Sequence, residues 1–277
     1  MEQTKIEWCD STVNPTENCD GCELWNTATG VHKCYAGKMT ERWKGKGAFD
    51  QPVVLKPGRM AATLKWKDLT GTDRPSKPWL NGMPRIIFVG DMADLFSKGV
   101  PFEYIEKEVI ETAFNSPHNY MLLTKQSQRM LDFVEWHLAQ DPPSGWPSNV
   151  WLGVSVTNQA TTSRMDYLRI CAQLIGFSSI NKPKYFVSYE PALTYVDFRH
   201  KFAVDLIIIG GESGVSEPTL LDTMTVWDVI NLCKEYKIAP FVKQMGTRWA
   251  VQKRSDSYKG GKMEDWPADI RVREMPK

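Results

Sequence analysis

The chain has 277 residues, with 34 Lys and Arg against 33 Asp and Glu and a formal net charge of +1. This length allows a full hydrophobic core, which excludes a minimal disulfide or zinc scaffold, and the balanced charge disfavours a polybasic, histone-like binder. No run of about 18 apolar residues exists, and Met1–Asp10 lacks the apolar core of a signal peptide, so a cytoplasmic protein without a membrane span is expected.

Apolar runs that end in a polar or glycine-bearing turn recur along the chain, most of them spaced by about 30 residues, the length of one βα unit. A weaker run over Lys5–Ser11 is expected to form the first strand. Because the later runs are continuous rather than alternating, they are typical of parallel strands covered on both faces. The six later strands are predicted at Ile86–Phe96, Tyr120–Gln126, Val150–Val156, Tyr185–Pro191, Leu206–Gly214 and Ala239–Gly246.

Segments with apolar residues at helical spacing lie between these strands. The interval from Tyr189 to Leu206 is too short for a helix and its turns, so a loop is expected there. The predicted helices are Met60–Trp66, Phe102–Asn115, Ser127–Gln140, Thr161–Leu174 and Thr225–Tyr236.

This order of elements predicts an α/β fold with a parallel sheet, which either curls into a complete or partial barrel or opens into a doubly wound sheet. Residues 1–247 are expected to form a single (β/α) barrel-like domain, with a cysteine-bearing loop over 13–37 after the first strand. Residues 248–277 are expected to form a C-terminal appendage or lid rather than another βα unit.

Polar side chains follow each of the six later strands. In parallel α/β folds the functional site lies at the carboxyl ends of the strands. A polar end on one strand is uninformative. Polar ends on six strands predict one polar opening at the carboxyl ends of the strands, called the mouth below. The residues concerned are Asp91, Asp94, Thr124, Lys125, Gln126, Ser155, Ser188, Glu190, Glu212, Ser213, Lys243 and Gln244.

Three of the six cysteines, Cys19, Cys22 and Cys34, lie close together in the sequence with the spacing C-x2-C-x11-C. Without a signal peptide, such a group more often binds metal or does redox chemistry than forms disulfides. Three thiolates suit a [4Fe–4S] cluster whose fourth iron stays open for a ligand. They also suit zinc if His32 or Cys9 completes a tetrahedron, and unliganded thiols are the third alternative.

The other cysteines are predicted to be packed thiols. Cys9 lies in the expected first strand, and Cys171 and Cys233 lie at core positions of predicted helices, where a free cysteine behaves as a small hydrophobic residue. His32 has an alternative to metal binding, because it can stack on Trp25 as an ordinary loop residue.

Together these segments resemble a phage-associated family of three-cysteine, radical-SAM-like proteins. The resemblance implies a partial (β/α)6, TIM-like barrel of the radical S-adenosylmethionine type with a cluster loop after the first strand. It also implies a [4Fe–4S] cluster and S-adenosylmethionine as cofactors. The matching segments are IEWCDSTVNPTENC, KCYA, FVGDMADLF, LLTKQSQRM, NVWLGVSV, FVSYEPAL, IIIGGESG and FVKQMG.

Two features depart from the superfamily pattern. The usual cluster motif is C-x3-C-x2-C with an aromatic residue before the last cysteine, whereas here Tyr35 follows Cys34. A Gly-Gly-Glu normally follows an early strand and holds the methionine amino group, but Gly210–Glu212 follows a late strand. Gly90–Met92 is the better positional match for that role.

The resemblance implies a role for each candidate residue. Cys19, Cys22 and Cys34 would ligate the cluster, which with S-adenosylmethionine yields a 5′-deoxyadenosyl radical. The cofactor-binding candidates are Gly90, Asp91, Met92, Ser155, Ser188, Glu190 and Lys125, and the catalytic candidates are Glu212, Ser213 and Lys243, with Gln244 beside them. The structural alternatives are an ion pair between Lys243 and Glu212, a plain turn at Gly210–Gly211, and a strand end at Glu190–Pro191.

Basic and aromatic residues interleave over Lys38–Lys67 and again over Lys243–Arg254, a mixture that suits phosphate contacts and base stacking. With the phage association, this favours a nucleic-acid base as substrate, such as a hypermodified pyrimidine of phage DNA in an isomerase, lyase or repair reaction. The expected partners are nucleic acid or nucleotide and an electron donor such as flavodoxin or ferredoxin. The rival hypotheses are a solvated surface at these segments, a zinc-binding nucleic-acid-associated protein, and a non-catalytic radical-SAM-like partner protein.

Overall fold

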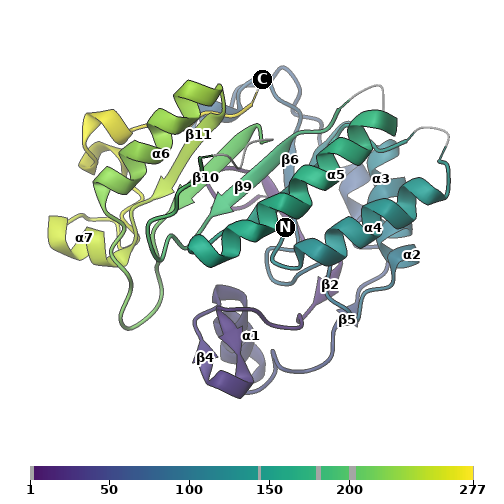
Figure 1. Cartoon of the computed structure of the whole chain (residues 1–277), viewed down its shortest axis with the longest axis horizontal. Coiled ribbons are helices and arrows are strands. Elements are labelled where there is room, and N and C mark those ends of the chain that lie inside the picture. Colours follow the sequence, from purple (N-terminus) through teal and green to yellow (C-terminus); the bar gives the residue numbers. More distant parts are fainter. Residues whose placement is uncertain (1–2, 143–144, 179–181, 200–203, 277) are drawn as a thin grey trace.

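The computed structural model describes residues 3–142, 145–178, 182–199 and 204–276. Within these ranges a seven-stranded parallel sheet curls into a half-barrel, and its strand order follows the order of the chain (Figure 1). The strands are β1 Ser11–Val13, β6 Ile86–Val89, β7 Asn119–Thr124, β8 Val150–Ser155, β9 Tyr185–Tyr189, β10 Leu206–Gly210 and β11 Ala239–Gln244.

The strand order decides between the two expected sheet types. Each strand pairs with the one before it in the sheet, from β1 beside β6 to β10 beside β11, and all these pairs are parallel. A doubly wound sheet reverses its order at a switch point, whereas this sheet never does. The prediction of an α/β, barrel-like fold is therefore confirmed at that level, in its partial form.

Helices cover the outer face of the curled sheet, as predicted (Figure 1). The predicted helix over Phe102–Asn115 contains a π-helical turn at Glu106–Ile110 between two short α-helical pieces. The predicted Met60–Trp66 helix is wrong in type, because Ala61–Lys65 forms a 3₁₀ helix. The covering helices are α2 Phe102–Ile105, α3 Glu111–Phe114, α4 Ser127–Ala139, α5 Arg164–Ser178 and α6 Thr223–Tyr236.

The concave face is filled near the amino ends of the strands. Trp8 is 2% exposed, and its ring lies 4.7 Å from that of Phe88 and 6.4 Å from that of Phe186. The expected first strand over Lys5–Ser11 is therefore wrong in its bounds, since the apolar residues before Ser11 plug the half-barrel and β1 begins only at Ser11. This plug leaves the carboxyl ends of the strands as the open part of the mouth.

Gly153 of β8 tests how tightly the concave face is packed. A Cβ added there would lie 2.4 Å from the ring of Phe186. We expect Gly153→Ala to lower the free energy of unfolding by about 1–3 kcal/mol, because overpacking forces the ring to move. The matched control is Gly176→Ala in α5, whose nearest neighbour is Lys182 Nζ at 3.8 Å. This control should raise stability by about 0.5–1 kcal/mol through helix propensity. Urea unfolding of both variants measures the two changes in unfolding free energy. Equal changes would contradict tight packing of Phe186 against Gly153.

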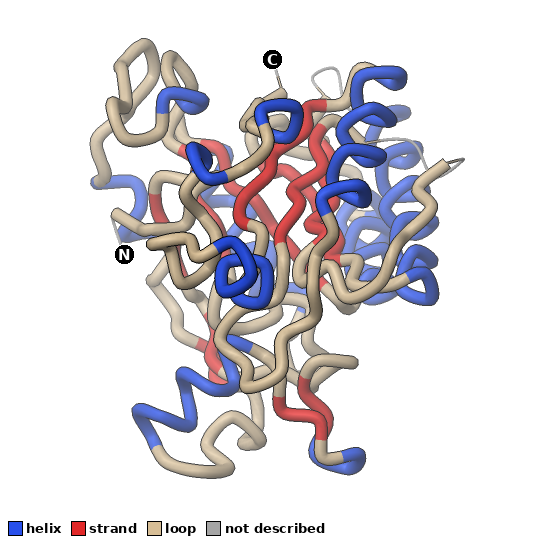
Figure 2. Tube along the Cα trace, turned by 90° about the vertical axis from the view of Figure 1, so that its left-hand side faces the viewer, coloured by secondary structure: helices blue, strands red, loops and turns tan. Residues whose placement is uncertain are grey.

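An excursion from the sheet lies between β1 and β6, at the bottom of Figure 1 and again apart from the main sheet in Figure 2. It contains two small antiparallel strand pairs, one α-helix and short 3₁₀ helices. The pairs are β2 Thr16–Glu17 with β5 Val54–Leu55 and β3 Trp25–Asn26 with β4 Val31–His32, and the helix is α1 Tyr35–Lys44. The three clustered cysteines lie in this excursion.

The chain ends with a segment that packs on the last strand. After α7 Thr247–Lys253, the backbone runs antiparallel to β11 at Phe241 and Arg273. The Arg273 guanidinium lies 4.7 Å from the ring of Trp79, so this segment also meets residues that precede β6. Among the described residues, no helix combines the length and the apolar character that a membrane crossing needs.

Candidate functional site

The cysteine-bearing loop lies across the carboxyl ends of several strands. Asn18 forms a parallel bridge with Ala93, beyond β6. The Gln126 side chain, beyond β7, donates to the Gly21 carbonyl at 3.1 Å. Lys38 of α1 donates to the Gly214 carbonyl, beyond β10, at 3.1 Å. The loop is thus fixed to the mouth by strands from both sides of the sheet.

The three sequence-predicted ligands lie together in this loop. Cys19 and Cys34 pack with Met92 against a small apolar group of Trp25, Ala36 and Phe49. All three cysteines are half-buried, and Cys34 immediately precedes α1 as its N-cap residue. The Leu24 backbone N–H lies 3.4 Å from the Cys22 sulfur and donates to it. The loop thus gathers three thiols in a partly dry setting.

Neighbouring thiols also affect the pKa values of Cys19 and Cys22 through electrostatic interactions. Burial raises the pKa of Cys19 to about 12, with smaller contributions in the same direction from Asp94, Cys34 and Cys22, while an N–H bond from Gly21 opposes the rise. Burial also raises the pKa of Cys22, and the nearby Lys125 ammonium partly offsets this. Lys125, predicted from the end of β7, therefore lies close enough to Cys22 to act on its charge.

Asp94 connects two strand ends beneath the cysteines. Its carboxylate accepts hydrogen bonds from the Thr124 hydroxyl at 2.7 Å, the Lys125 backbone N–H at 3.0 Å and the Phe96 N–H at 3.0 Å. Burial raises its pKa, and these donors oppose the rise. The sequence analysis identified Asp94 as a polar strand end, but its half-buried carboxylate is occupied by these backbone and hydroxyl donors, so it orders the mouth rather than facing a substrate.

The segment Gly90–Met92 lies beside the cysteines, at the end of β6. Asn14, one residue beyond β1, donates to the Asp91 carboxylate at 2.6 Å and accepts from the Met92 N–H at 3.0 Å. The Gly90 N–H donates to the Val13 carbonyl at 2.9 Å, and Gly90 has φ +83°, a conformation that favours glycine. Sequence reasoning missed Asn14, whose partners lie 77 and 78 positions away.

Four predicted residues form a polar layer on the concave face. Ser155 and Ser188 are register partners on β8 and β9, and both are nearly fully buried. The Ser188 hydroxyl donates to the Glu190 carboxylate at 3.2 Å, and Lys243 Nζ lies 2.9 Å from the other carboxylate oxygen. The proposed Lys243–Glu212 ion pair is therefore wrong, because Glu190 is the partner of Lys243.

Glu212 and Ser213 lie on the neighbouring loop after β10. One Glu212 oxygen accepts from the Thr219 N–H at 2.8 Å, and the other lies 3.9 Å from Lys33 Nζ of the cysteine loop. The Gln244 amide donates to the Ser213 hydroxyl at 3.1 Å. Glu212 is 3% exposed. Its ion pair with Lys33 connects the loop after β10 to the cysteine-bearing loop.

The remaining thiols and His32 have the structural roles predicted for them as alternatives to metal binding. Cys9, Cys171 and Cys233 are fully buried, with Cys9 in the apolar group on the concave face, as predicted for packed thiols. The His32 ring stacks on Trp25 at 4.4 Å, as the alternative predicted. Within the described ranges, no group of three or more His, Cys, Asp or Glu side chains is arranged to hold one metal ion.

Glu23, between Cys22 and Leu24, is a positioning residue that sequence reasoning also missed. Its carboxylate accepts two bonds from the Arg164 guanidinium, at 3.0 and 2.7 Å, and one from the Thr157 hydroxyl at 2.9 Å. Burial opposes ionisation of Glu23, but the Arg164 bonds outweigh it and lower its pKa to about 2. The pair fastens the cysteine loop to the start of α5.

Replacing Arg164 with alanine should loosen this attachment. We expect the free energy of unfolding to fall by about 2 kcal/mol, a typical contribution of charge-assisted hydrogen bonds, since Glu23 loses both Arg164 donors and the Ser155 carbonyl loses a third hydrogen bond from Arg164. Arg169→Ala on the same helix is the control, because Arg169 is exposed and, within the described residues, its hydrogen bond is to Gln173, at 3.4 Å. Chemical denaturation compares the two, and indistinguishable variants would show that the Arg164 pair does not fix the loop.

Comparison with known proteins adds one match. A family model described as "Protein of unknown function (DUF5131)" matches residues 3–267. No curated protein and no solved structure matches the chain.

Proposed function

The chain belongs to the DUF5131 family, and on that premise we propose from its own residues that it is a radical S-adenosylmethionine enzyme with a [4Fe–4S] cluster, acting on a nucleic-acid base. The observation that carries the proposal is the placement of Cys19, Cys22 and Cys34. These three half-buried thiols lie on one loop that is fixed over the carboxyl ends of a curled parallel sheet. This is the edge where parallel α/β folds place their chemistry.

The donor set suits a cubane cluster. Three cysteine thiolates leave one iron of the cube free for a further ligand, and backbone N–H groups stand at the sulfurs, as at Cys22. The cysteines of a cubane bind different iron atoms, whereas the ligands of zinc must converge on a single ion at about 2.3 Å from each sulfur. Hydrogen bonds to the sulfurs and partial burial are among the features by which proteins tune such clusters.

When bound, the cluster and S-adenosylmethionine would supply a 5′-deoxyadenosyl radical, and the protein's part is to position and to exclude water. Gly90–Met92 lies beside the cysteines and is the segment proposed to contact the methionine or ribose end of that cofactor. Lys125, near Cys22, is proposed to neutralise a carboxylate or phosphate. An electron donor of the flavodoxin or ferredoxin type is the partner this chemistry needs.

The polar layer is proposed to hold the ribose or the substrate. The bond from Ser188 and the ion pair with Lys243 keep the Glu190 carboxylate in one orientation, while Ser155 donates to the Glu190 carbonyl at 3.2 Å. Glu212 and Ser213 lie on the loop that also contacts Lys33 and Lys38 of the excursion. These groups are proposed to face the reacting base and to move its protons.

Anaerobic reconstitution of the full chain with iron and sulfide tests the proposal. The expected result is a brown protein with about four iron atoms per chain, which releases 5′-deoxyadenosine when reduced in the presence of S-adenosylmethionine. A colourless protein with stoichiometric zinc would overturn the cluster. A brown protein that releases no 5′-deoxyadenosine would instead favour a non-catalytic partner protein.

A further inference from the structure

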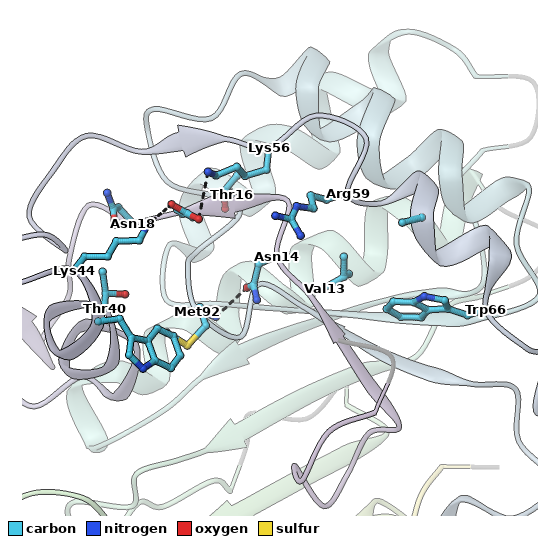
Figure 3. A pocket seen from close by; sticks show the side chains of 13 residues that line it. Val13, Asn14, Thr16, Asn18, Thr40, Lys44, Lys56, Arg59, Trp66 and Met92 are labelled. Carbon is cyan, nitrogen blue, oxygen red and sulfur yellow. Dashed lines mark hydrogen bonds and ion pairs between the residues drawn. The ribbon is translucent and has the colours of Figure 1, made fainter.

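A pocket of about 330 Å³ lies between the excursion and the end of β6 (Figure 3). Its volume falls at the lower end of the roughly 300–1,000 Å³ that small-molecule sites occupy, so it suits a single nucleotide rather than a large ligand. Its walls come from segments far apart in the sequence, including β1, β2, α1, the 3₁₀ helix Ala61–Lys65 and Met92.

The pocket carries a local excess of positive charge that the chain as a whole lacks. Three cations and one carboxylate line it, which gives the lining a net charge of +2 against +1 for all 277 residues. Glu17 holds Lys44 at 2.6 Å and Lys56 at 3.3 Å. Arg59 has no carboxylate partner among the described residues, and its guanidinium points into the pocket towards Asn14 (Figure 3). A phosphate group would supply the missing counter-charge.

The pocket also offers aromatic surface and an unused hydroxyl. Trp43 lines the pocket and is 66% exposed, although tryptophan side chains are on average largely buried. Trp66 contributes a second aromatic wall. The Thr16 hydroxyl is fully buried in the lining and has no hydrogen-bond partner in the part of the chain described here. Cations, aromatic rings and a free hydroxyl together match one nucleotide unit, with its phosphate, base and sugar.

The second basic and aromatic segment, Lys243–Arg254, does not provide such a surface. Trp249 is 3% exposed, and Lys243 is engaged by Glu190 inside the half-barrel. The two segments look alike in sequence, but Lys38–Lys67 brings Trp43 and Arg59 to one pocket, whereas Trp249 of the second segment is buried.

The pocket adjoins the cysteine site directly. Met92 lines the pocket and also packs against the small apolar group around Trp25 on which Cys19 and Cys34 pack. Asn14 lines it as well and is bonded to Asp91 and Met92. A group bound here would therefore lie next to the segment that the proposed function assigns to the cofactor.

We infer that this pocket binds one nucleotide unit of the substrate, with the phosphate on Arg59 and Lys56 and the base stacked on Trp43. The inference rests on the nucleic-acid part of the proposed function and not on its radical step. Its test needs only binding, so a failure of the 5′-deoxyadenosine assay and a failure here are separate results.

Fluorescence anisotropy of a labelled single-stranded oligodeoxynucleotide, titrated with the full-length protein at several salt concentrations, tests the site. Arg59→Ala should weaken binding about tenfold at low salt, the loss of one charge-assisted contact, and should reduce the slope of log affinity against log salt by about 0.7. Trp43→Ala should weaken binding about tenfold without changing that slope, and Trp43→Phe should restore most of the affinity.

The matched control for charge is Arg42→Ala, an exposed arginine on α1 outside the pocket lining. It should leave the affinity and the salt slope unchanged. Competition by thymidine monophosphate would identify a free nucleotide as a sufficient ligand, whereas binding of the oligonucleotide alone would identify the polymer as the source. Equal losses for Arg42→Ala and Arg59→Ala, an unaffected Trp43→Ala, or no binding of either probe would overturn the site.

Discussion

Replacing Cys22 with alanine is expected to abolish both the brown colour of the reconstituted protein and the release of 5′-deoxyadenosine. The cluster is proposed to have three protein ligands, and loss of one leaves only Cys19 and Cys34 to hold it. The Cys22 sulfur also accepts a hydrogen bond from the Leu24 backbone N–H, which fixes its position in the loop. Iron content and turnover, measured after anaerobic reconstitution, should both fall to background.

Cys233→Ala is the matched control, because Cys233 is a fully buried thiol of α6 that belongs to the outer core. It should lose some stability through the small cavity but keep its iron and its activity. A Cys22→Ala protein that retained iron and turnover would remove Cys22 from the ligand set. Equal loss of iron in both variants would mean that the colour reports folding and not ligation.

The sequence predicted the sheet well because its main signal is local. Six continuous apolar runs became β6 to β11, and the polar residues after them do gather at one end. The first strand was misplaced for the same reason, since Trp8 and its neighbours have strand-like composition but plug the barrel. Composition alone does not distinguish a strand from an apolar plug.

Residues of the candidate site could be predicted only where the local sequence identifies them. The cysteines were predicted from their spacing, and the polar strand ends from their position after apolar runs. Glu23 was not predicted, since its partner Arg164 lies 141 positions away. Trp43 and Trp249 stand in similar basic surroundings, and only the fold decides that one is exposed and the other buried. The partner of Lys243 was likewise open until the strands were placed side by side.

Glu190→Gln is expected to cost about 3 kcal/mol of folding free energy and to abolish turnover. The ion pair with Lys243 is mostly buried, with side-chain exposures of 15% and 22%, and its removal leaves the ammonium without its carboxylate partner. Burial lowers the pKa of Lys243, but its attraction to Glu190, together with smaller contributions from Glu7 and Cys9, keeps the net shift upward. Lys243 therefore stays charged at neutral pH, so chemical denaturation at pH 7 measures the full loss.

The double variant Glu190→Gln with Lys243→Met separates the structural role of the pair from its catalytic one. Removal of both charges takes away the unpaired ammonium, so most of the lost stability should return, because buried pairs are often replaceable by apolar groups. Turnover should stay at background, since the reacting site then lacks both the carboxylate and the ammonium. If the double variant recovered activity together with stability, the pair would only support the fold, and the polar layer would lose its proposed role towards the substrate.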